Sequence, residues 1–162
     1  MQQPILIALI FLSVMAGCTT QKTDKTYSYN QEASLPDTLS FNPLEWKVIT
    51  SSLNKNDKTM STLYGNDIAV QNARTGAAYS AGSVLAMVTW SQKEDEHWFG
   101  ARIPATVRSI EEVRFSSTGG DNMSPAYEQY TGQPLRRNEA NDPEKAKHRI
   151  AYIVEQRASV MP

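Results

Sequence analysis

Few residues in this sequence have side chains that could do chemistry on their own. The chain of 162 residues contains two histidines, His97 and His148, and one cysteine, Cys18. An imidazole can ligate a metal or move a proton near neutral pH, and a thiol can form covalent bonds. With so few of these groups, the sequence offers no Ser/His/Asp or Cys/His arrangement, and we assign no catalytic residue.

His97 lies in the stretch "KEDEHWF", directly after three acidic residues, which suggests a metal site or acid–base chemistry. Consecutive residues of a strand or loop point in different directions, however, so they rarely converge on one ion. We therefore interpret this stretch as the solvated end of a hairpin and predict no metal site. Trp98 and Phe99 are expected to anchor the returning strand.

His148 lies in "NDPEKAKHRIAYIVEQR", residues 141–157, which has the pattern of a helix. Asp142 is a good N-cap residue, and Pro143 suits the first helical position. The apolar side of this helix is formed by Ala146, Ile150, Ile153 and Val154. At about 100° per residue, His148 lies nearly opposite that side. We therefore expect His148 to be exposed or to face a partner rather than to be a buried ligand.

Cys18 follows an apolar run, residues 5–16, that is too short to span a bilayer as a mature helix. The run has the length of the apolar part of a signal peptide, and small residues precede the cysteine. "VMAGC" resembles a bacterial lipobox, although Met15 stands where leucine is usual. We predict a lipoprotein signal peptide at residues 1–17, with Cys18 as the lipidated first residue. Thr19 is not the aspartate associated with inner-membrane retention, which favours a periplasm-facing lipoprotein of the outer membrane.

The charge of the chain argues against a nucleic-acid partner, and its composition divides it into a polar tether and one domain. The formal net charge is -1 and no Lys/Arg cluster stands out, so we predict no nucleic-acid partner. Residues 18–37 are polar and nearly free of branched aliphatic residues, which predicts a tether that cannot fold alone. Residues 38–162 are long enough for one domain with its own core.

Periodicity and turn residues predict an α+β domain in which helices flank an antiparallel sheet. Asn42 and Pro43 open an expected helix over residues 42–53, with Trp46, Ile49 and Leu53 on its apolar side. The other expected elements are a strand ending at the turn of residues 65–67, a short helix over 68–74 that Gly76 ends, a central strand over 84–90, one or two strands within 101–115 and a loop over 116–125.

Four stretches together resemble a known family. "FNPLEWKVIT", "TMSTLYGNDIAVQNAR", "YSAGSVLAMVTW" and "YEQYTG" are similar, in order and approximate spacing, to the cytochrome P-460 domain, over most of residues 41–135. This domain is similar in fold to the beta-type c-prime cytochromes. The resemblance implies a mainly antiparallel sheet with helices, a periplasmic location and a homodimer. It also implies a c-type haem used to oxidise hydroxylamine or bind nitric oxide.

The resemblance places the haem attachment segment, C-x-x-C-H, near the C-terminus. Aligned on His148, the two cysteine positions are taken by Glu144 and Lys147, and neither can form a thioether bond. Covalent c-type haem is therefore excluded by the chemistry of this sequence. His148 remains the single candidate haem ligand.

Three functions stay open. The first is a lipid-anchored binding or structural module that has lost covalent haem attachment and has no cofactor. The alternative is an oxidoreductase or gas sensor for hydroxylamine or nitric oxide, with non-covalent haem ligated by His148, which must then point into a pocket. The third is an envelope subunit that docks its C-terminal helix onto a protein partner. Whether the protein is an enzyme is left undecided by the sequence.

Overall fold

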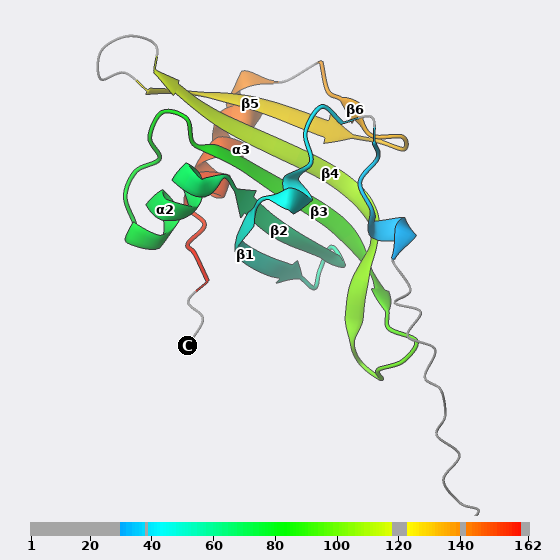
Figure 1. The fold of residues 1–162 in the computed structure, drawn as a ribbon. Helices are drawn as coiled ribbons and strands as arrows, with labels where there is room; N and C mark the ends of the chain where they lie inside the picture. Colours follow the sequence, from blue (N-terminus) through cyan, green and yellow to red (C-terminus); the bar gives the residue numbers. More distant parts are fainter. Residues whose placement is uncertain (1–29, 38, 118–122, 140–141, 160–162) are drawn as a thin grey trace, which may run out of the picture.

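The computed structural model describes residues 30–37, 39–117, 123–139 and 142–159. In this part of the chain, one antiparallel sheet has the order β1-β2-β3-β4-β5-β6, which is also the order along the sequence (Figure 1). The strands are β1 (Lys47–Asn54), β2 (Thr59–Gly65), β3 (Val84–Glu94), β4 (Arg102–Ser117), β5 (Met123–Thr131) and β6 (Arg136–Arg137). The helices are α2 (Asp67–Thr75), α3 (Pro143–Val154) and the 3₁₀ turns η1 (Gln31–Ala33) and η2 (Pro43–Glu45). The expected α+β fold with an antiparallel sheet and flanking helices is confirmed.

Each face of the sheet carries its own apolar cluster. On one face, α2 and α3 pack over a cluster that includes Leu85, Val113 and Ile153, all fully buried. The opposite face carries a second cluster around Trp90 and Ile110, which is covered by Ala33, Leu35, Leu39 and Phe41 of the N-terminal segment. None of the helices in the described ranges has the length and apolar character needed to cross a membrane.

Local signals correctly predicted both α-helices and the central strand, β3. The side chain of Asn66 caps α2 by accepting a hydrogen bond from the backbone N–H of Ala69 at 3.0 Å, and Gly76 ends the helix at φ 69°. Asp142 caps α3 in the same way, with the backbone N–H of Glu144 as donor at 3.0 Å. Each of these capping hydrogen bonds joins residues no more than three positions apart, so the local sequence can predict where the helices begin.

The helix expected over residues 42–53 is wrong. Asn42 does cap a helix, because its side chain accepts a hydrogen bond from the backbone N–H of Leu44, but that helix is only the single turn η2. The chain then extends into β1. Three β-branched residues in succession, residues 48–50, favour an extended backbone. Pairing with β2 then provides hydrogen-bond partners for this extended strand. Leu53, expected on an apolar helix face, is exposed.

Two hairpin ends differ in part from the expectation. The loop predicted over 116–125 is wrong at both ends, because pairing of β4 with β5 continues to Ser117 opposite Met123, and residues 118–122 lie outside the described residues. The stretch "KEDEHWF" does form a hairpin end, as expected. Trp98 and Phe99 do not anchor the strand there, however; both are exposed, since the register of β3 with β4 already positions the returning strand.

The segment before residue 38 packs on the sheet. The indole Nε1 of Trp90 donates to the carbonyl oxygen of Ala33 at 2.9 Å, and Leu35 joins the same apolar cluster. Asn30 Nδ2 donates to the carbonyl oxygen of Pro104 at 2.7 Å. The packed part of the chain thus includes residues that we assigned to the tether. The rest of the expected tether, from Cys18 to residue 29, and the signal peptide lie outside the described residues.

Glu112 places a carboxyl group inside the second apolar layer. Its side chain is 1% exposed, and Arg114 Nη2 lies 2.8 Å from Oε1. Within the described ranges, neither carboxylate oxygen accepts a hydrogen bond of good geometry. Burial raises the pKa of Glu112, and the nearby charge of Arg114 opposes this rise only in part. The charged form of Glu112 therefore costs the folded state free energy.

Replacing Glu112 by glutamine should change how stability depends on pH. Because the folded pKa lies above the unfolded one, the contribution of Glu112 is fully present at low pH and is lost as pH rises through the folded pKa. We expect Glu112→Gln to raise the free energy of unfolding at pH 7.5 relative to wild type, and to do so less at pH 4.5. Urea titrations at both pH values measure this difference. Glu96→Gln, on the exposed hairpin end, is the control, and equal pH dependence in Glu112→Gln and wild type would contradict the argument.

Candidate functional site

A groove of about 600 Å³ lies on the face of the sheet that carries α3. Its floor is built from β1 to β5, and its walls are the first turn after β1 and one side of α3. The groove floor and the apolar cluster lie side by side on one face of the sheet, because residues two apart on a strand share a face. On β3, the side chains on this face pass from Leu85 through Met87 to Thr89, that is, from apolar to polar.

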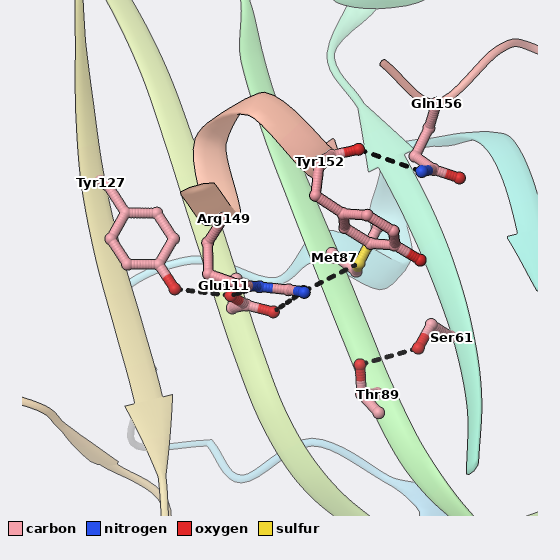
Figure 2. A network of polar contacts seen from close by, with 8 residues as sticks. All are labelled: Ser61, Met87, Thr89, Glu111, Tyr127, Arg149, Tyr152 and Gln156. Carbon is pink, nitrogen blue, oxygen red and sulfur yellow. Dashed lines mark hydrogen bonds and ion pairs between the residues drawn. The ribbon is translucent and has the colours of Figure 1, made fainter. Parts of the chain in front are cut away.

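A row of hydroxyl groups crosses four strands on the groove floor. Register pairs Ser52 with Ser61, Ser61 with Thr89, and Thr89 with Ser109. All four residues line the groove, and the hydroxyl oxygens of Ser61 and Thr89 are 2.8 Å apart (Figure 2). Gln129 of β5 adds an amide beside this row. Hydroxyl and amide groups both donate and accept hydrogen bonds, so this floor can match a ligand with either kind of group.

A buried ion pair joins α3 to the sheet at the edge of the groove. Glu111 on β4 is 2% exposed, and Arg149 on α3 donates to both of its oxygens, Nε to Oε1 at 2.8 Å and Nη2 to Oε2 at 2.6 Å. The hydroxyl of Tyr127 donates to Oε1 of Glu111 at 2.5 Å. Figure 2 shows the three side chains converging from β5, β4 and α3. This two-pronged geometry is the strong form of the arginine–carboxylate contact.

The charges of this cluster are mutually stabilised. The hydrogen bonds from Arg149 to Glu111 raise the pKa of the guanidinium, which stays charged. Burial and the neighbouring Glu111 carboxylate raise the pKa of Tyr127 far above its usual value, so its hydroxyl keeps the proton that it donates. The ring of Tyr152 lies 4.6 Å from the guanidinium carbon of Arg149 and adds a cation–π contact.

The residues that the sequence singled out lie outside this groove. His148 is exposed on α3, as expected, and does not belong to the groove lining. His97 is exposed at the hairpin end, where its backbone N–H donates to Asp95 Oδ1 at 2.8 Å. Cys18 lies outside the described residues. Across the part of the chain that the structure describes, no three His, Cys, Asp or Glu residues come together to hold a metal ion.

Sequence reasoning missed the polar residues of the groove. The available signal was the pair of acids in "SIEEV", residues 109–113, inside an otherwise apolar strand. Two adjacent acids on a strand face opposite sides, so at least one of them faces an apolar layer and requires a partner. That the partner of Glu111 is Arg149, 38 residues away, follows only from the folded structure.

Together, the fold and the groove define a single α+β domain with a six-stranded antiparallel sheet and a polar groove beside its last helix. The family model Cytochrome P460 matches residues 44–148, which is more than half of the chain, so this protein belongs to the cytochrome P460 family. The expected resemblance is thereby confirmed. The family is normally haem-binding, which connects the chain with haem-related function. Among curated proteins, no match is found.

The residues of the groove do not fit a haem. A porphyrin requires largely apolar walls and an axial ligand for its iron. The groove floor is a row of hydroxyl groups, and no histidine or cysteine is among its lining residues. The thioether of Met87 is 2% exposed and lies 3.8 Å from Arg149 Nη2, which occupies it. Glu144, Lys147 and His148 align with the expected haem attachment segment. All three are exposed on α3 and are absent from the groove lining.

Removing one partner of the ion pair should destabilise the domain strongly. Arg149→Met keeps an apolar stem but leaves Glu111 charged and unpaired, which typically costs about 3–5 kcal/mol. The double variant Glu111→Met with Arg149→Met should recover most of that loss, because neither charge then remains buried. Urea unfolding of both single variants, the double variant and the exposed-site control Arg108→Met gives the coupling free energy. Equal losses in Arg149→Met and Arg108→Met would show that the pair does not hold α3.

Proposed function

We propose that this protein is a lipid-anchored protein of the cell envelope whose cytochrome P460 family domain binds a small, neutral, hydroxyl-rich molecule in place of covalently attached haem. Sugars and polyols are the ligand class. The observation that carries this proposal is the row of hydroxyl groups across the groove floor, from Ser52 to Ser109.

The charges of the groove favour a neutral ligand. Glu111 is paired with Arg149 inside the groove, and Lys55 and Asp57 bring opposite charges to its rim. The charged side chains of the lining thus sum to zero. A neutral ligand with several hydroxyl groups requires closely spaced groups that donate and accept, which the floor supplies. Tyr152 adds an aromatic side chain to the wall, suited to the apolar C–H face of a sugar ring.

The anchor and location rest on the N-terminal sequence. The apolar run before Cys18 and the "VMAGC" segment support lipidation of that cysteine. Thr19 supports an outer-membrane, periplasm-facing location. Family membership supports a homodimer. The apolar side of α3, proposed as a surface for a protein partner, packs in this structure against the chain's own sheet through Ile150, Ile153 and Val154.

Ligand binding is tested by saturation-transfer NMR with neutral sugars, polyols, sugar acids and amino sugars. We expect neutral compounds to bind and charged ones to bind more weakly. Thr89→Val with Ser109→Ala should weaken binding by at least about tenfold, since each lost hydrogen bond is worth roughly 1 kcal/mol. The matched control is Thr62→Val, on the opposite face of β2.

A haem titration of the same protein separates this proposal from its alternative. A Soret band that appears with haemin and disappears in His148→Ala would contradict the proposal and support the non-covalent haem protein. Neutral sugars and polyols that fail to bind at millimolar concentration would also overturn it.

The lipid anchor is tested in cells with globomycin, which blocks cleavage of lipoprotein signal peptides. We expect the unprocessed precursor to accumulate with lower electrophoretic mobility. Cys18→Ser should give a product that is unaffected by the drug and carries no lipid. Unchanged mobility of the wild-type protein would remove the claim of lipidation, and it would leave the ligand proposal standing.

A further inference from the structure

The hairpin of β3 and β4 projects beyond the other strands. Pairing of β2 with β3 ends at Ser91, and pairing of β4 with β5 ends at Ser109. The ladder between β3 and β4 continues past both points, to Glu94 opposite Arg102. In Figure 1 this two-stranded projection extends away from the rest of the sheet.

The tip of the projection presents two neighbouring aromatic side chains to the outside. Trp98 is 72% exposed, and Phe99 is fully exposed. The turn that carries them is held by its own backbone hydrogen bonds, from Asp95 to the carbonyl of Ala101 at 3.1 Å and from Ala101 to that of Trp98 at 3.0 Å. The aromatic pair is therefore held at the surface by the turn instead of folding back on the sheet. Such exposed apolar groups commonly mark a contact with a membrane or a partner.

The N-terminal segment runs along this same projection. Glu32 pairs with Lys93 at 2.8 Å and accepts from the hydroxyl of Thr106 at 3.1 Å. Asn30 and Trp98 line one shallow pocket beside the tip. The described part of the chain therefore begins, at Asn30, close to the aromatic tip.

The distance to the anchor is short. Eleven residues separate Cys18 from Asn30, and they can span about 40 Å at full extension. A lipid on Cys18 thus keeps the projection within reach of the same bilayer. We propose that Trp98 and Phe99 insert into the interfacial layer of that bilayer and give the domain a second membrane contact. This inference rests on the proposed lipid anchor, and tryptophan is the residue type enriched at that layer.

Charge at the tip determines the kind of bilayer. Glu94 is paired with Arg102 at 3.1 Å, whereas Asp95 and Glu96 add two further acidic groups. Anionic lipids would repel this tip, so its attraction to a membrane is apolar, and a zwitterionic surface suits it best. A lipid on Cys18 holds the chain at the bilayer but leaves the domain free to turn on its tether, and a second contact fixes its orientation.

The test measures whether lipid touches Trp98 when the chain is anchored at Cys18. Because Cys18 is the single cysteine, the chain from Cys18 onward can be coupled to maleimide phospholipid in phosphatidylcholine vesicles, independently of acylation in cells. Bromine atoms on the acyl chains quench tryptophan on contact. We expect tryptophan emission to fall in brominated vesicles for the wild type and to stay constant for Trp98→Phe, in which only Trp46 and Trp90 remain.

A second variant, Phe99→Ser, should reduce the quenching of Trp98, whereas Leu53→Ser, an exposed apolar site on β1, should leave it unchanged. Thermal unfolding of the variants checks that they fold. Equal tryptophan emission of the wild type in brominated and plain vesicles would overturn the membrane contact. The exposed aromatic tip would then be explained as a contact for a protein partner. Since anchoring here is chemical, that result is distinct from a failure of lipidation in the globomycin experiment.

Discussion

The ion pair between Glu111 and Arg149 is the constraint on which the functional face of this domain depends. A carboxylate that is almost fully buried on a sheet requires a partner, and here the partner comes from the last helix. The pair holds α3 at a fixed rotation over β4, with Tyr127 on one side and Tyr152 on the other. The groove is formed between this helix and the polar floor of the sheet, so its shape depends on the helix being held in place.

Glu111 and Glu112 are adjacent on β4, and the strand places them on opposite faces of the sheet, in different environments. Glu111 faces α3 and meets a guanidinium in a two-pronged contact, so its charge is stabilised. Glu112 faces the N-terminal segment, where it is equally buried but lacks well-formed hydrogen bonds from the described chain, so burial raises its pKa. The first residue helps to build the groove, and the second lowers the stability of the opposite layer at neutral pH.

Sequence alone predicted those elements whose ends are marked by nearby residues: α2, with Asp67 or Asn66 as its cap and Gly76 at its end, and α3 from Asp142. It failed over residues 42–53, where a genuine capping residue began a single turn and a run of β-branched residues then entered the sheet. It could not give the groove, because the row from Ser52 to Ser109 exists only once the register of four strands is set. Register depends on contacts between distant segments, which local patterns do not specify.

The same ion pair explains why His148 faces outward. His148 and Arg149 are adjacent on α3, and adjacent residues of a helix point about 100° apart. Turning the helix to bring His148 over the groove would move Arg149 away and leave Glu111 buried without its partner. The free energy that a buried ion pair loses on separation, about 3–5 kcal/mol, opposes that rotation. His148 and Arg149 therefore cannot both face the groove, and in this sequence the arginine does.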